Sequence, residues 1–225
     1  MKLSFYRVDP AYCDYLRRFD ERVPHISDRK QRRPFVGILI SKIYNINYFA
    51  PLTSPKAKHI HMKNQVDFLK IKSGALGAIN FNNMIPINKE NLNKINLKIS
   101  DTDTKAEKDY KNLLVNQLSW CTEHRDNIIK KATKLYNIII EGKVSDTLIE
   151  RCCDFRLLEQ KCVEYTEIQK AIQEVAPALE EKAPSSKSAQ PGSMAAHIHK
   201  AEMTQSKEQT HNTSKTKSPK SRKER

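Results

Sequence analysis

The chain has 225 residues and a formal net charge of +14, with 38% hydrophobic and 29% charged residues. This excess of positive charge indicates an acidic partner, and nucleic acid is the first candidate. The longest apolar runs, Ile38–Ile40 and Ile138–Ile140, are far too short to cross a bilayer, and the amino terminus lacks the apolar segment of a signal peptide. We therefore expect a cytoplasmic protein that does not associate with membranes.

The cysteine content argues against a disulfide framework. Five cysteines are present, and none of them forms a paired CxxC spacing that would suggest a zinc knuckle. We expect reduced thiols with structural roles.

The carboxyl-terminal part of the chain differs in composition from the rest. No aromatic residue follows Tyr165, and from about Ala176 the sequence consists largely of Pro, Ser, Gln, Thr and Lys. Such a segment buries too little apolar surface to offset the entropy lost on ordering it. The composition predicts a folded domain over residues 1–175 and a disordered basic tail over residues 176–225. Before Ala171 the chain has 30 basic and 20 acidic residues, so most of the charge belongs to the folded part.

The first hundred residues are typical of a β-sheet. A strand is expected at 3–8, followed by a helix that begins at Pro10 and runs to Arg18. Two β-rich runs then form a plausible hairpin, and further short runs continue the pattern. The expected later strands cover 35–44, 47–52, 66–71, 76–81, 84–87 and 95–99. Together they predict an antiparallel sheet of about six strands.

Helices are expected after residue 100. Thr104 and Glu107 form a capping box, and apolar residues at three- and four-residue spacing follow as far as Cys121. A second helix covers 128–139 and stops near Gly142, and a third covers about 155–172. Strands followed by helices predict an α+β fold.

The segment after the expected strand at 47–52 carries the most suggestive chemistry. Thr53, Ser54 and Lys56 place two hydroxyls and an ammonium within four residues, and Pro51 and Pro55 restrict the backbone on either side. Hydroxyls and an ammonium can hold a phosphate and stabilise charge that develops on it. The alternative is a simple turn with a solvated lysine.

Basic residues flank this loop and recur on the second helix. The candidates for RNA contact are Arg29, Lys30, Arg32, Lys58, His59, Lys130, Lys131 and Lys134. For any single one of them, a solvated position is an equal alternative. As a group they predict salt-dependent RNA binding.

Two histidines also lie near the loop. His59 and His61 share one face of a possible strand, but no third ligand is nearby, so no metal site is predicted. His59 is a competitor to Lys56 for proton transfer.

A series of short motifs follows in order along the first 165 residues. They are Phe19-Asp20 with Val23-Pro24, Pro34–Gly37, Tyr48–Lys56, Leu76–Phe81, Met84–Ile87, Tyr110–Gln117, Gly142-Lys143 and Asp154–Glu159. In these motifs the chain resembles the ToxN/AbiQ family of endoribonuclease toxins from type III toxin–antitoxin systems. The resemblance extends from residue 1 to about residue 165, and the tail has no counterpart.

The resemblance implies a strongly twisted antiparallel sheet decorated by helices, similar to that of other small toxin ribonucleases. It implies cleavage of cellular or phage messenger RNA without metal or cofactor, leaving 2′,3′-cyclic phosphate and 5′-hydroxyl ends. DNA lacks the 2′-hydroxyl and should not be cut. The implied inhibitor is an antitoxin RNA of repeated pseudoknots held in a closed protein–RNA assembly, with a role in phage defence or growth control.

The resemblance also assigns site residues. Thr53, Ser54 and Lys56 fall on the family's active-site loop, and Tyr12 falls on an active-site tyrosine. Arg33 stands where a family member has a lysine, and we expect it to clamp phosphate because a guanidinium is a poor proton shuttle. Arg29 stands where the family can have a tyrosine. The alternative function is a non-catalytic basic RNA-binding module, a degenerate toxin.

Overall fold

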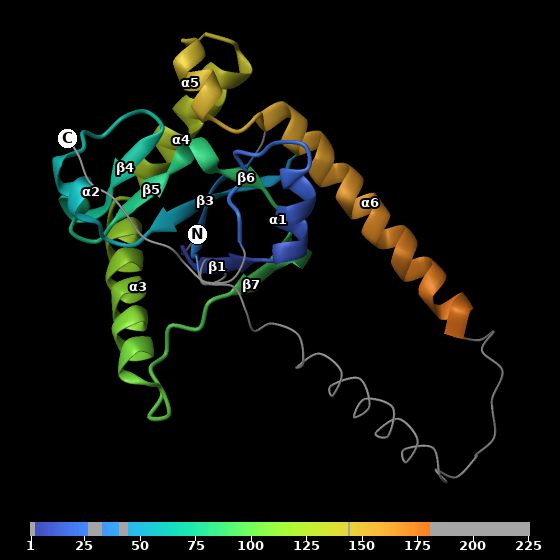
Figure 1. Cartoon of the computed structure of the whole chain (residues 1–225), viewed down its shortest axis with the longest axis horizontal. Helices are drawn as coiled ribbons and strands as arrows, with labels where there is room; N and C mark the ends of the chain where they lie inside the picture. Colours follow the sequence, from blue (N-terminus) through green and yellow to red (C-terminus); the bar gives the residue numbers. More distant parts are fainter. Residues whose placement is uncertain (1–2, 27–32, 41–44, 144, 181–225) are drawn as a thin grey trace, which may run out of the picture. The chain divides into compact units, whose positions relative to one another are not determined.

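The computed structural model describes residues 3–26, 33–40, 45–143 and 145–180. One compact unit spans Met1–Ala178, and a second unit, Leu179–Arg225, is described only where it includes the end of a helix. The elements of the first unit are drawn in Figure 1. In chain order they are β1 (Phe5–Val8), α1 (Pro10–Arg17), β2 (Phe35–Ile40), β3 (Asn47–Thr53), α2 (Ala57–His61), β4 (Phe68–Lys70), η2 (Ile71–Gly74), β5 (Ala78–Asn80), η3 (Phe81–Asn83), β6 (Ile85–Pro86), η4 (Lys89–Asn91), β7 (Leu92–Lys94), α3 (Lys105–Glu123), α4 (Arg125–Ile140), α5 (Asp146–Arg151) and α6 (Phe155–Glu180).

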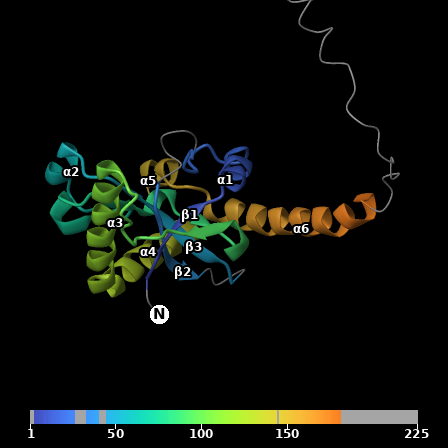
Figure 2. The same cartoon turned by 90° about the horizontal axis from the view of Figure 1, so that it is seen from below.

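The strands form one twisted antiparallel sheet in the order β4-β5-β3-β2-β1-β7, and β6 pairs with β3. Strand β3 is central, because it pairs with β2 along one edge and with β5 and β6 along the other. Helices α2 and α3 lie at one end of the sheet, and α6 extends from the opposite end (Figure 2). The predicted α+β fold with an antiparallel sheet is confirmed.

The core joins the sheet to the helices through large buried side chains. Tyr48 of β3 packs edge-on against Tyr136 of α4 and Phe155 of α6, with ring centroids 5.5 and 5.6 Å apart. The hydroxyls of Tyr48 and Tyr136 both donate to Oε1 of the fully buried Glu159, at 3.0 and 2.8 Å. These contacts fix α4 and the first half of α6 on the sheet.

The predicted start of α3 and the predicted end of α4 are both confirmed. Thr104 forms the predicted capping box with Glu107, and Gly142 ends the α4 region with φ +67. Helix α5 was not predicted, and α6 continues to Glu180, so five residues assigned to the tail are helical. The remainder of that tail lies outside the described residues. Within the described part of the chain, no helix is long and apolar enough to cross a membrane.

Two strand predictions are wrong. The expected strand at 95–99 is replaced by β7, three residues earlier, because β1 begins at Phe5 and pairs with residues 92–94; beyond them, Ile95 N still donates to Phe5 O. The histidines expected on a strand lie instead in α2, where His59 is buried and His61 is exposed. An alternating pair of histidines is too short a pattern to separate a strand from one helical turn.

Candidate active site

The predicted loop leaves the sheet at the end of β3. Pro51 is buried within the strand, Thr53 is its last residue, and Ser54, Pro55 and Lys56 are exposed before α2 begins. The exposed Ser54 and Lys56 therefore lie next to solvent at a strand end, directly after Thr53. This is the placement that a phosphate-binding loop requires.

Arg33 lies across from this loop. The register pairs Phe35 with Pro51, and Leu52 N donates to Pro34 O at 2.9 Å, so the same antiparallel register sets Arg33 opposite Thr53. Arg33 is half-buried, and burial lowers the pKa of its guanidinium. Among the described residues no carboxylate lies within ion-pair distance of it. A partly desolvated cation without a counter-ion is suited to binding an anion.

Thr53 presents the second available group. Its Oγ1 is buried and has no hydrogen-bond partner among the described residues. Its carbonyl oxygen, in contrast, accepts a hydrogen bond from Gln117 Nε2 of α3 at 3.3 Å. The backbone of Thr53 is therefore held in place, while its buried hydroxyl oxygen forms no hydrogen bond within the described structure.

A tight turn over residues 71–77 supports both ends of the loop. A Cβ on Gly77 would lie 2.0 Å from Thr53 O, and one on Gly74 would lie 2.7 Å from His59 O. Both glycines have positive φ, +99 and +97. The turn is closed by the bond from Ile71 N to Gly77 O at 2.9 Å. Only glycine allows this backbone to approach the loop so closely.

Tyr12 lies beneath the surface. Its side chain is fully buried, its hydroxyl donates to Pro86 O at 2.7 Å, and its ring packs edge-on against Tyr165 at 5.0 Å. Burial raises the pKa of Tyr12 well above its usual value. In this conformation the hydroxyl is committed to the fold and cannot touch RNA.

The predicted RNA contacts near the loop are divided by exposure. Lys58 is exposed, but His59 is only 2% exposed and its ring lies 5.9 Å from that of Phe68. Burial, followed by the nearby Lys56 and Lys58, lowers the pKa of His59. The imidazole therefore faces the protein, while Lys58 faces solvent beside the loop. Arg29, Lys30 and Arg32 lie outside the described residues.

The lysines of α4 are not joined to the loop by any described contact. Lys130 and Lys134 are exposed and lie one helical turn apart, whereas Lys131 donates to Gln65 O at 3.0 Å. The side chains of Lys130 and Lys134 are thus open to solvent, whereas Lys131 already has a protein partner.

Metal-ligating side chains do not cluster in the described ranges. No group of three or more His, Cys, Asp or Glu residues there could hold a metal ion. All five cysteines are free and buried, and burial raises the pKa of Cys121 and Cys152 to about 12. They are structural, as predicted.

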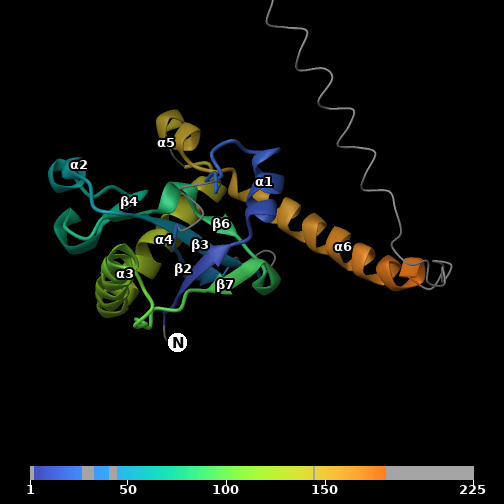
Figure 3. The ribbon, with the colours of Figure 1, turned by 60° about the horizontal axis from the view of Figure 1, so that its bottom comes forward.

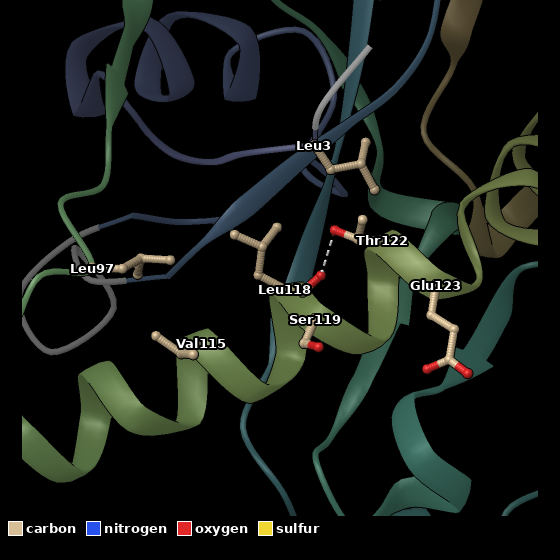
Figure 4. Close-up of a pocket in the computed structure, with 7 residues that line it drawn as sticks. All are labelled: Leu3, Leu97, Val115, Leu118, Ser119, Thr122 and Glu123. Carbon is tan, nitrogen blue, oxygen red and sulfur yellow. Dashed lines mark hydrogen bonds between the residues drawn. The ribbon is translucent and has the colours of Figure 1, made fainter.

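A second concave region lies between α3 and the strand edge near the amino terminus (Figure 4). It has a volume of about 430 Å³. It is lined by Leu3, Leu97, Val115, Leu118, Ser119, Thr122 and Glu123. This lining is mainly apolar and carries one carboxylate but no cation, so the groove does not suit a phosphate.

Three residues that shape the loop, Gln117, Gly74 and Gly77, were not predicted as part of the site. The sequence pattern indicates only a helical face for Gln117 and a strand for Gly77. The available signal for Gln117 was an uncharged amide on an otherwise apolar stripe of α3, since a buried amide needs partners. Helix α3 is seen almost along its axis in Figure 3, close to α2 and β4.

The fold is that of a basic α+β protein that carries Thr53, Ser54 and Lys56 at one end of its sheet. The model of the family "Toxin ToxN, type III toxin-antitoxin system" matches residues 4–163, and the chain belongs to this family. The resemblance noted in the sequence is confirmed.

Relatives and solved structures agree with this assignment. Endoribonuclease ToxN of Bacillus thuringiensis subsp. kurstaki is 34% identical over 172 residues, which cover 75% of this chain and 87% of that protein. Endoribonuclease AbiQ of Lactococcus lactis subsp. lactis is 26% identical over 177 residues, covering 74% and 91%. A solved bacterial type III toxin–antitoxin structure, described as showing selective toxin inhibition by a non-coding RNA pseudoknot, is 33% identical with a TM-score of 0.62, covering 74% of this chain and 99% of that one.

Proposed function

We propose that this chain is the toxin of a type III toxin–antitoxin system, an endoribonuclease that acts in the cytoplasm on cellular or phage messenger RNA. Its family and its similarity to endoribonucleases ToxN and AbiQ support this activity. The RNA pseudoknot of a similar solved structure supports an antitoxin RNA as the inhibitor. The anti-phage role of AbiQ supports phage defence.

One observation carries the catalytic part of the proposal. The register of β2 and β3 sets the backbone of Arg33 opposite Thr53; the Arg33 guanidinium is half-buried without an ion pair among the described residues, and Thr53 Oγ1 has no hydrogen-bond partner there. The exposed Ser54 and Lys56 follow directly. This placement at the end of β3 supports a shared role for the four side chains in holding one phosphate. Preorganised donors of this kind stabilise the charge that develops in a transition state.

The proposed reaction uses the substrate's own nucleophile. The 2′-hydroxyl gives its proton to solvent water as its oxygen bonds to the adjacent phosphorus, the bond to the 5′-oxygen breaks, and a 2′,3′-cyclic phosphate and a 5′-hydroxyl result. Arg33, Thr53 and Ser54 hold the phosphate oxygens, and Lys56 gives a proton to the departing 5′-oxygen. Because the nucleophile comes from RNA, DNA is not a substrate.

Antitoxin RNA would bind across a wider surface. The exposed Lys58, Lys130 and Lys134 supply positive charge at and away from the loop. Their contacts with phosphate would make binding weaken as salt is raised.

The test is cleavage of messenger RNA by the purified chain in EDTA, with the ends of the products mapped. We expect cyclic-phosphate ends with the wild type and their loss with Ser54→Ala, whereas Arg33→Lys retains more activity than Arg33→Met because it keeps a cation. Ser119→Ala, an exposed serine on α3, is the control. If Ser54→Ala cleaves RNA at the wild-type rate, Ser54 has no part in the reaction.

Gel retardation of the same RNA tests the alternative of a non-catalytic binding module. If the wild-type protein retards all of the RNA in the gel but produces no new RNA ends, the chain binds RNA without cleaving it. That result would favour the binding module and contradict the proposed endoribonuclease activity.

A further inference from the structure

We propose that Gln117 is a positioning residue that sets the place of Thr53 in the active site. This inference rests on the proposed ribonuclease function, because it concerns the loop that carries the reaction. Gln117 does not touch substrate, and it acts through the backbone of Thr53.

The contacts of Gln117 link three parts of the chain. Its side-chain nitrogen Nε2 donates to Leu76 O at 2.6 Å and to Thr53 O at 3.3 Å. The amide nitrogen has two hydrogens, so each carbonyl can receive one of them. Helix α3 is thereby joined to both the 71–77 turn and the end of β3.

The orientation of this amide is fixed by its surroundings. Gln117 is only 1% exposed, and its Oε1 is buried without a hydrogen-bond partner in the described structure. A rotated amide would set that oxygen against two carbonyl oxygens, which repel it. The nitrogen must therefore face Thr53 and Leu76.

Gln117 also supplies an attraction between the 71–77 turn and Thr53, which the absence of a side chain on Gly77 permits but does not create. The absence of a side chain on Gly77 lets the turn come within contact of Thr53 O, but close contact alone does not attract two carbonyl-bearing segments to each other. The shared donor supplies the attraction. Because α3 is a helix of 19 residues with a capped amino terminus, it is a firm base for this link.

The consequence concerns the hydroxyl of Thr53. Its carbonyl is held by Gln117, and its Oγ1 is left without a partner. Losing the link would shift the hydroxyl relative to Arg33, and a displacement of about 1 Å at a reacting centre costs on the order of 100-fold in rate.

Gln117→Glu is the most informative variant, because it keeps the shape of the side chain and replaces the donor by an acceptor. We expect kcat to fall about 100-fold near pH 8 with KM for RNA changed less than about threefold. As the pH is lowered, the carboxyl regains a proton and one donor, so the activity of the variant relative to wild type rises. Asn116→Asp is the matched control, since it makes the same charge change on the exposed neighbour in α3.

Gln117→Met keeps the inference testable if the glutamate variant does not fold, because methionine fills a similar volume without a donor. Cleavage rates are compared per folded molecule, with thermal unfolding as the check. An unchanged kcat, or a loss confined to KM or to the folded fraction, would overturn the role of Gln117 while wild-type cleavage upheld the proposed function. Absence of cleavage by wild type would instead reject the proposed function and, with it, this inference.

Discussion

The two ends of strand β3 use their polar groups in opposite ways. At the Tyr48 end, the hydroxyl lies 3.0 Å from Glu159 Oε1 and 3.2 Å from Phe155 O, deep in the core. At the Thr53 end, the hydroxyl has no hydrogen-bond partner and the guanidinium of Arg33 has no ion-pair partner among the described residues. The polar group at the Tyr48 end of β3 is hydrogen-bonded within the protein core, whereas the one at the Thr53 end has no partner among the described residues. The proposed site lies at the Thr53 end.

The same criterion separates the residues assigned by resemblance. Among the described residues Thr53 Oγ1 has no hydrogen-bond partner and Arg33 forms no ion pair, and Ser54 and Lys56 are exposed. The hydroxyl of Tyr12, in contrast, donates to Pro86 O. A family motif locates both kinds of residue equally well. Only the structure tells which of them still has a group to offer.

Among the substitutions considered, we expect Gly77→Ala to disrupt the Thr53 end of β3 most severely. A Cβ at this position would lie 2.0 Å from Thr53 O, and the backbone has φ +99. We expect unfolding to become at least about 3 kcal/mol easier and cleavage to be lost, because the positive φ alone costs about 1–2 kcal/mol and the contact adds to it. Chemical denaturation and RNA cleavage are the measurements.

Gly142→Ala is the matched control, since its φ is +67 but nothing lies within 4 Å of the added carbon. It should show the cost of the backbone conformation alone and retain cleavage. Equal effects of the two substitutions would show that the contact with Thr53 is unimportant.

Tyr48→Phe tests the other end of β3, where the Tyr48 hydroxyl is hydrogen-bonded to Glu159. Removing this hydroxyl leaves the buried Glu159 carboxylate with one donor fewer, and a hydrogen bond to a charged group contributes about 1.5–3 kcal/mol. We expect a loss of that size in the free energy of unfolding, with kcat of the folded protein unchanged. A fall in kcat at unaltered stability would mean that the two ends are not separate in function.

Much of the fold follows from patterns that are local in the sequence. The capping box at Thr104 and the residues Thr53 to Lys56 could be recognised because each signal occupies a few consecutive positions. The placement of β7 could not, because it depends on where β1 begins.

The supports of the site are absent from such patterns. Gln117 lies 64 residues from Thr53 in sequence, and Gly77 is adjacent to it only through the pairing of β3 with β5. Likewise, the burial of Tyr12 depends on Pro86 and Tyr165, which are remote in the chain. A sequence motif can identify a reactive side chain. Tertiary contacts decide whether its position is supported, as for Thr53, or whether its polar group is already hydrogen-bonded, as for Tyr12.

Tyr12→Phe sharpens the comparison with a smaller effect. The substitution removes one buried hydrogen bond between neutral groups, so we expect a loss of about 0.5–1.5 kcal/mol in stability and little change in kcat. Thermal unfolding and single-turnover cleavage measure the two quantities. A large loss of kcat at an unchanged melting temperature would restore Tyr12 to the reacting centre.

The smallest effect is expected at His59, which lies where the loop rejoins the fold. Burial, aided by Lys56 and Lys58, lowers the pKa of His59 in the folded state, while the unfolded value is about 6.5. When the pH falls below that value, the unfolded chain binds the proton first, so the stability supplied by neutral His59 is lost as the pH approaches the lower folded pKa. Urea unfolding between pH 7.5 and 5.5 should therefore show a steeper loss for wild type than for His59→Gln. His61→Gln should behave as wild type, because His61 is exposed on the same helix. Equal slopes for all three proteins would mean that His59 titrates alike in the folded and unfolded chain, and that its burial places no demand on its charge.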